Sequence, residues 1–209
     1  MLPSLLTPMT PSARNRLVAW PTVIVAAAYA LVAWASLQLA VAPGFATPLF
    51  PSAGIAVAAA LTYGRAGVLG TALGSLAINV FMGISLGTLG PSSLWLPLAV
   101  AGGAALQAAA ARAWVRRHVR QPLTLTTPGD VARFFAIAAP LACLISATAF
   151  LTALVAAGAV TPELGWTNWW NWWAGDTLGV LMGAPAALTL IGQPAADWRR
   201  RRLTVGLPL

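Results

Sequence analysis

The sequence contains no lysine and few acidic residues, so its charge comes almost entirely from arginine. Its 209 residues carry 12 basic side chains against 4 Asp and Glu, which gives a net charge of +8. Charged residues make up only 8% of the chain, whereas a soluble domain carries roughly 25%. The basic residues stand in short clusters beside apolar segments. This pattern favours anionic lipid headgroups as partners and gives no indication of nucleic-acid binding.

Cysteine and histidine are equally scarce, which excludes several kinds of site. The single cysteine, Cys143, has no partner for an intrachain disulfide. The single histidine, His118, lies in an arginine cluster. No set of His, Cys and carboxylate residues has the spacing of a metal site, and no Ser-His-Asp or Cys-His combination is indicated. We therefore expect no metal, no cofactor and no enzymatic activity.

Long apolar runs dominate the sequence, since 59% of its residues are hydrophobic. A helix that crosses a bilayer core needs about 20 apolar residues, and the runs predict an all-α, polytopic integral membrane bundle with six transmembrane helices. The second run is the shortest, and Pro48 and Pro51 interrupt its start. The predicted spans are residues 17–41, 50–63, 66–86, 92–114, 131–157 and 169–191.

The arginines fall in alternate gaps between these runs, and this predicts the orientation of the spans. Two arginines precede the first run, Arg65 follows the second, five surround the gap between the fourth and fifth, and four follow the sixth. The N-terminus and the C-terminal arginines at 199–202 are therefore predicted to be cytoplasmic. The chain divides into a cytoplasmic segment 1–16, a membrane domain 17–192, and a basic segment 193–209 whose apolar end is expected to begin a seventh helix.

Small residues at a spacing of four predict two closely packed helix faces. One face contains Gly70 and Gly74, and the other contains Gly175, Gly179 and Gly183. Packing within one chain is the simpler interpretation of both faces. A homodimer interface is the alternative.

Asp176 is the one carboxylate within a predicted span, about 10 Å from the outer end of its helix. A charge at that depth is costly and usually faces the bundle interior. The carboxylate caps the interrupted start of the second helix, forms the floor of a ligand pocket that opens outward, or does both. Tryptophans beside it form either an interfacial belt or the wall of that pocket. The candidate ligand-binding residues, all expected in the outer half of the bundle, are Asp176, Asn79, Ser52, Gly54, Trp172, Trp173, Asn171 and Gln38.

Three segments resemble the first type of membrane-associated sensor domain. Residues 50–61 are similar to its aromatic-Pro-Pro-x-Gly-Ile-Ala stretch, and residues 70–79 resemble its next helix, which ends in an asparagine. Residues 172–185 resemble its Trp-Trp-x-Gly-Asp-x-Leu-Gly-x-x-x-x-x-Pro helix. The resemblance implies a multi-pass input module of the bacterial inner membrane, with more helices than the six predicted here. Such modules precede a cytoplasmic histidine kinase or diguanylate cyclase domain.

The sequence therefore predicts a sensor of a small extracytoplasmic or membrane-phase molecule. Its kinase or cyclase output is expected on a continuation of the chain or on a separate partner protein. The alternative is the substrate-binding membrane subunit of a vitamin-type uptake transporter, which also needs an outward pocket. In a third interpretation, a passive scaffold, Asp176 only organises packing.

Overall fold

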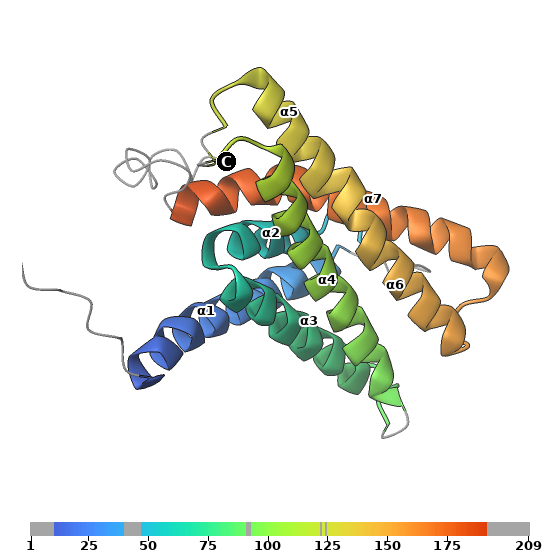
Figure 1. The fold of residues 1–209 in the computed structure, drawn as a ribbon. Coiled ribbons are helices and arrows are strands. Elements are labelled where there is room, and N and C mark those ends of the chain that lie inside the picture. The colour runs from blue at the N-terminus through green and yellow to red at the C-terminus, as the bar shows by residue number, and fades with distance from the viewer. Residues whose placement is uncertain (1–10, 40–46, 91–92, 122, 124, 192–209) are drawn as a thin grey trace, which may run out of the picture.

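The computed structural model describes residues 11–39, 47–90, 93–121, 123 and 125–191, and throughout these residues the regular structure is helical. Five segments are long and apolar enough to cross a membrane, and one helix, α2, is shorter. Successive helices run back and forth through the bundle (Figure 1). The elements in chain order are α1 (Pro11–Leu37), α2 (Pro51–Tyr63), α3 (Arg65–Ser85), α4 (Trp95–His118), α5 (Pro128–Ala136), η2 (Ile137–Leu141), α6 (Ala142–Ala156) and α7 (Pro162–Ile191).

Most observed bounds lie within four residues of the predicted ones, but two helices begin much earlier than predicted. The first helix begins at Pro11, so residues 11–16 of the predicted cytoplasmic segment are helical. The last helix begins at Pro162, seven residues before the predicted start at 169. This early start places Asp176 near the middle of α7 rather than close to its outer end. The predicted end of the first helix at Val41, the start of the fourth at Ser92 and the whole 193–209 segment lie outside the described residues.

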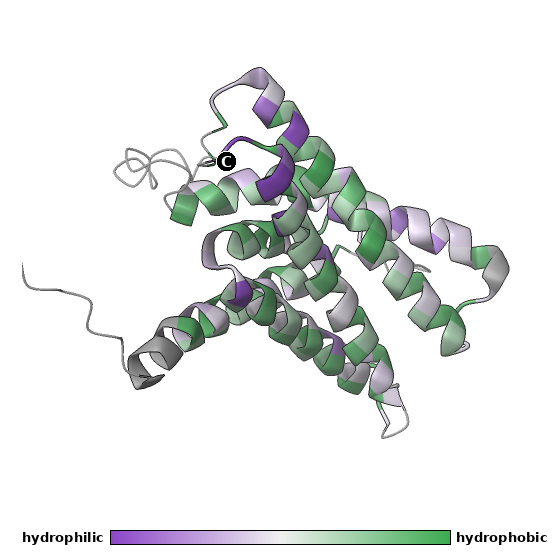
Figure 2. Ribbon diagram, viewed as in Figure 1, coloured by the Kyte–Doolittle hydropathy of each residue, from purple (hydrophilic) through white to green (hydrophobic). Residues whose placement is uncertain are grey.

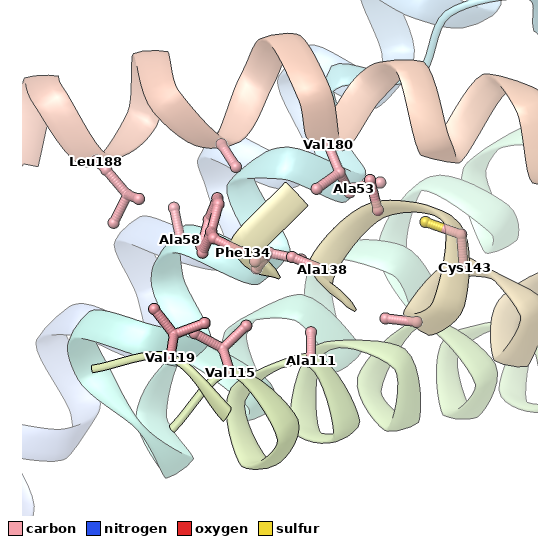
Figure 3. Close-up of a cluster of buried hydrophobic side chains, with 14 residues drawn as sticks. Ala53, Ala58, Ala111, Val115, Val119, Phe134, Ala138, Cys143, Val180 and Leu188 are labelled. Carbon is pink, nitrogen blue, oxygen red and sulfur yellow. The ribbon is translucent and has the colours of Figure 1, made fainter. Parts of the chain in front are cut away.

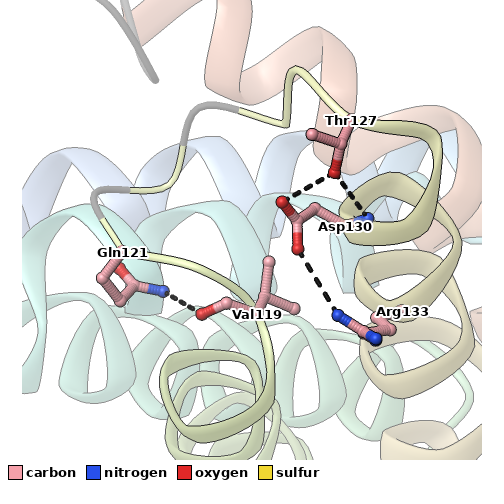
Figure 4. Close-up of polar contacts among 5 residues, drawn as sticks. All are labelled: Val119, Gln121, Thr127, Asp130 and Arg133. Atoms are coloured by element: carbon pink, nitrogen blue, oxygen red, sulfur yellow. Dashed lines mark hydrogen bonds and ion pairs between the residues drawn. The ribbon is translucent and has the colours of Figure 1, made fainter.

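The start of α5 is fixed by a local polar cap (Figure 4). Thr127 accepts a hydrogen bond from the backbone N–H of Asp130 at 3.2 Å and donates its hydroxyl to Asp130 Oδ2 at 2.8 Å. An acidic side chain in the first turn also complements the helix dipole. Arg133 Nη1 lies 3.8 Å from Asp130 Oδ1. This cap extends the helix to Pro128, three residues before the predicted start at 131.

The helices α5 and α6 form one continuous apolar segment, Pro128–Ala156, interrupted by the π-helical turn η2. Pro140 lies within that turn. Because proline has no N–H and its ring crowds the preceding turn, a wider turn accommodates it without ending the helix.

The short helix α2 lies at the centre of the bundle, in contact with α1, α3, α4 and α7. Its buried residues are mostly alanine, so the neighbouring helices approach closely. The largest buried cluster joins α2 to α4, α6 and α7 (Figure 3). Phe134, Val57, Val115 and Val180 are its bulkiest fully buried side chains.

The chain segment that leads into α2 packs along the glycine face of α7. Phe50 donates its backbone N–H to the carbonyl of Gly175 at 3.1 Å, which satisfies a backbone group that no membrane water would reach. A Cβ at Gly179 would collide with the carbonyl oxygen of Phe50, and one at Gly183 would lie 2.7 Å from the carbonyl oxygen of Pro51. Gly54 faces back across the same contact, where a Cβ would lie 2.5 Å from Ala184 N. Glycine is therefore required for this helix crossing.

A second crossing joins α3 to α1. A Cβ at Gly70 would lie 2.8 Å from the carbonyl oxygen of Thr22, and one at Gly74 would lie 2.6 Å from that of Ala26. Both glycine faces are thus covered by helices of the same chain.

Many large apolar side chains are exposed on the outside of the bundle, as expected for a surface in contact with lipid. Green, the colour of hydrophobic residues, recurs along the helices in Figure 2. Trp20 is 69% exposed and Leu31 is 67% exposed. Hydrophilic residues gather where α4 ends and α5 begins. The last turn of α4 contains Arg116, Arg117 and His118, which also complement the helix dipole.

The α2–α7 crossing gives the first prediction. Gly179→Ala places a methyl group against the Phe50 carbonyl oxygen and should destabilise the fold by about 1–3 kcal/mol, the usual cost of overpacking. Gly102→Ala on α4 is the matched control, because a Cβ at Gly102 meets nothing within 4 Å. The measurement is chemical unfolding of the purified chain in mixed micelles. Equal stability of the two variants would contradict the close approach.

Candidate functional site

A cluster of buried or half-buried polar side chains lies where the helices converge. We call it the Asp176 cluster. It draws residues from α1, α3, α4, α6 and α7, while Ala53 and Ala56 of α2 close it from the centre. Polar groups within apolar helices are costly unless they find partners. The members of the Asp176 cluster are Tyr29, Ser75, Asn79, Gln107, Ser146 and Asp176.

Asp176 is held by α6. Ser146 donates its hydroxyl to Asp176 Oδ2 at 2.6 Å, and Asp176 is only 5% exposed. The sequence raised the alternative that Asp176 caps the start of α2, and this is wrong. The N-terminus of α2 has no side-chain cap, and its approach is bound instead by the backbone carbonyl of Gly175. Gly175, the residue before Asp176, thus binds the chain at the start of α2 through its backbone carbonyl. The carboxyl group of Asp176 points into the interior instead.

Trp172 lies one helical turn before Asp176 and faces the same interior. Its ring stacks on Phe150, with centroids 3.5 Å apart, and lies 6.4 Å from the Phe50 ring. Its indole Nε1 lies beside the carboxyl group of Asp176 but has no partner at hydrogen-bonding geometry. A buried N–H without a partner is unusual in a folded protein and marks a place where a water or ligand atom is expected.

Two adjoining cavities meet at this tryptophan. The smaller one, about 30 Å³, lies within the Asp176 cluster, and it is large enough for a water molecule. The larger one is about 310 Å³, with a mostly apolar wall that reaches the α3–α4 connection at Leu86, Thr88 and Leu89. The two cavities share four lining residues, Phe50, Asn79, Val100 and Trp172.

Asp176 lies near mid-length of α7, deeper than predicted, whereas Asn79 lies six residues before the end of α3, in the half that is expected to face outward. Asp176 is 14 residues from the start of α7, or about 21 Å. Gln107 and Ser75 are likewise near the middle of α4 and α3. The larger cavity extends toward the predicted outer end.

Three of the eight predicted ligand residues, Asp176, Asn79 and Trp172, line the cavities. Asn79 lines both of them and donates its side-chain amide to the carbonyl oxygen of Ser75 at 2.8 Å. Ser52 and Gly54 instead serve packing. Ser52 is fully buried and donates its hydroxyl to the carbonyl oxygen of Tyr29 at 3.0 Å, and Gly54 lies against α7.

The remaining predicted residues face other surroundings than the two cavities. Gln38 is exposed and donates its amide to the carbonyl oxygen of Trp34 on its own helix. Asn171 is exposed. Trp173 donates its indole N–H to the carbonyl oxygen of Pro140 in η2 at 2.9 Å and stacks on Trp169. The tryptophans therefore divide into one that faces the interior cavities and a row that packs along α6 or faces outward.

Sequence reasoning did not identify Tyr29, Ser75, Gln107, Ser146 and Phe150 as cavity residues. Gln107 was the clearest available signal, because it is a buried amide in the middle of an apolar helix, 2% exposed, with its Nε2 3.2 Å from Cys143 Sγ. Serine and tyrosine occur in many apolar helices and give no such signal. The Phe150 ring became relevant only through its stacking on Trp172.

Charge and ligand type in the cluster limit its chemistry. The cavity walls contain a carboxyl group and a phenol as ionisable groups, and no arginine or histidine. Among the described residues, no group of three His, Cys, Asp or Glu side chains lies close enough to hold a metal ion. The arrangement places hydrogen-bonding groups beside an apolar wall, which suits the binding of a small molecule.

These features define a polytopic helical membrane protein with two adjoining cavities, the larger of which opens at the surface. The chain matches the MASE1 family model over residues 21–204 and belongs to that family, the first type of membrane-associated sensor domain. MASE1 domains are membrane sensory input domains, so the predicted sensor family is confirmed. Comparison with curated proteins and with solved structures gave no match for either.

The bond between Ser146 and Asp176 gives the second prediction. Ser146→Ala leaves a buried carboxylate without its donor and should lower the free energy of unfolding by about 1–3 kcal/mol. Thr152→Ala is the control, since Thr152 lies on the same helix, is exposed, and bonds only the carbonyl oxygen of Thr148. Adding Asp176→Asn should produce a non-additive effect in the double mutant. Additive losses in chemical unfolding would show that the two residues are not coupled.

Proposed function

We propose that this chain is a sensory input domain that crosses a bacterial inner membrane six times, with both termini in the cytoplasm. It binds a small molecule in the cavities at Asp176 and relays binding to a cytoplasmic output. The observation that supports the proposal best is the adjoining pair of cavities, one apolar and one polar, that share Asn79 and Trp172.

The six-pass arrangement requires α2 to cross with the backbone that precedes it. The 13 residues of α2 span only about 20 Å of a hydrocarbon core of about 30 Å. Thr47 is buried at 6% exposure, and Phe50 bonds to α7. Irregular backbone is tolerated at membrane depth when protein covers it and satisfies its polar groups. Within the segment 47–50, Thr47 is buried, Phe50 is half-buried with its N–H bonded, and Pro48 is exposed but has no N–H to satisfy. An extended segment of this length makes up the missing part of the crossing.

The orientation rests on arginines at one end of the bundle. The guanidinium group of Arg112 lies 3.2 Å from the position of a Cβ on Gly64, so the end of α4 packs against the α2–α3 turn. The turn and the α4–α5 connection lie toward the upper left in Figure 1, whereas the α3–α4 and α6–α7 connections lie toward the lower right. The positive-inside bias assigns the arginine end to the cytoplasm.

Single cysteines test this topology in a Cys143→Ser background. Ala157→Cys follows α6 and should react with a membrane-impermeant maleimide in intact cells. Gln121→Cys follows α4 and should react only after the membrane is permeabilised. Both positions are exposed. The reverse pattern would overturn the proposed orientation and is the result expected if α2 does not cross. Labelling of both from one side would remove the α5–α6 segment as a crossing.

Helix α7 is the proposed relay, because it contributes to both the ligand cavity and the central packing. Trp172 and Asp176 line the cavity, while Gly175 and Gly179 contact the chain before α2. A ligand shifts such packing only by the difference in its affinity for the two arrangements. A shift of α7 caused by ligand binding in the cavity would therefore also change the α2–α7 crossing and move α7 up to its end at Ile191.

The signalling proposal is tested by filling the junction of the cavities. Val100 lines both, and Val100→Phe should abolish the response of a chimera that carries a diguanylate cyclase output. Leu98→Phe is the control, because Leu98 is 57% exposed on the same helix. The readout is the level of cyclic dinucleotide in cells grown with and without an extract that activates the unmodified chimera.

An unchanged response of the Val100→Phe chimera would refute the proposed site. Accumulation of a labelled vitamin in cells that express the chain with a transport partner would instead support the uptake alternative. Membership of a sensory family favours the sensor.

A further inference from the structure

The chemistry of the two cavities narrows the ligand that the proposed sensor would bind, and this inference rests on that proposed function. The larger cavity has a mostly apolar wall and a volume of about 310 Å³. At about 30 Å³ for each water-sized group, it has room for on the order of ten non-hydrogen atoms. Its wall joins the Asp176 cluster at Asn79 and Trp172, so a long ligand in it ends beside polar groups.

Charge excludes an anionic end group. The cavity walls contain no arginine or histidine that could pair with an anionic ligand. A carboxylate or phosphate would therefore be buried without a cationic partner, which is strongly unfavourable in an apolar interior. A ligand without a negative charge remains.

The hydrogen-bonding groups then distinguish the neutral ligands from the cationic ones. Ser146 donates to Oδ2 of Asp176, and the carboxyl group has capacity to accept from a further donor. Trp172 Nε1 is buried beside it and needs an acceptor. An ammonium group would have to lose its hydration to pair with Asp176, a cost that offsets much of the charge attraction, and it cannot accept from the indole N–H. A ketone accepts but cannot donate. A hydroxyl group does both with one oxygen atom.

We propose that the cavities bind an uncharged amphiphile, with an apolar body of about ten non-hydrogen atoms in the larger cavity and a terminal hydroxyl in the smaller one. The hydroxyl donates to the carboxylate of Asp176 and accepts from the indole N–H of Trp172. The rings of Phe50 and Phe150 hold the indole in place for this contact.

The test compares four probes of similar length: 1-decanol, decane, decylammonium and decanoate. Binding to the full chain in lipid nanodiscs is measured by titration calorimetry. The Val100→Phe chain serves as the blank that removes partitioning into lipid. We expect 1-decanol to bind about tenfold more tightly than decane, which corresponds to one or two net hydrogen bonds. Decylammonium should bind less tightly than 1-decanol, and decanoate should show no saturable binding.

The variant Trp172→Phe isolates the indole N–H while keeping an aromatic ring on Phe150. It should reduce the preference for 1-decanol over decane several-fold and leave decane binding unchanged, an effect that general loss of folding would not produce. Trp170→Phe is the control, because Trp170 is 50% exposed on the same helix and lines neither cavity.

The outcomes separate the inference from the function on which it rests. If no probe binds above the Val100→Phe blank, the proposed ligand site itself fails. If decane binds as tightly as 1-decanol, the cavity is real but water occupies the polar end, and the hydroxyl assignment is overturned. Tightest binding by decylammonium or decanoate would overturn it in favour of a charged end group.

Discussion

The backbone N–H of Phe50 reaches the carbonyl of Gly175 because the glycines along one side of α7 have no Cβ to keep the two chains apart. The rest of the bundle depends on this contact. It brings α2 to the centre, where its small side chains allow α1, α3 and α4 to pack around it. It also supplies a partner to the backbone that precedes α2, a helix that is too short to cross alone and has no side-chain cap at its start.

Helix α7 contributes both to the central helix packing and to the buried polar cluster, because its residues point in different directions. Gly175 and Gly179 contact the approach to α2, while the next residue after Gly175, Asp176, turns toward Ser146 on α6. A change in the position of α7 therefore alters a backbone contact and a buried polar contact together. Such coupling suits a domain in which a bound molecule must be felt at a distance, provided that the molecule prefers one packing.

The sequence predicted the helical membrane architecture, because long apolar runs admit few other structures in a bilayer. It also predicted Asp176, Asn79 and Trp172, where a polar or aromatic residue stood out from its surroundings. It could not predict that Ser146 binds the carboxylate, since a serine in an apolar helix often bonds its own backbone. The depth of Asp176 was misjudged because α7 begins at Pro162, seven residues before the start predicted at Trp169.

The π-helical turn at Ile137–Leu141 changes the direction in which every later side chain of this segment points. A π turn contains one residue more than an α-helical turn, and one residue corresponds to about 100° of rotation in a helix with 3.6 residues per turn. The capped start at Thr127 lies before it and Ser146 lies after it. If these residues formed a regular α-helix, α5 would keep its orientation, but α6 would be rotated about the helix axis. Ser146 would then point away from Asp176. The turn that contains Pro140 thereby determines the rotation of α6 relative to α5 about their common axis.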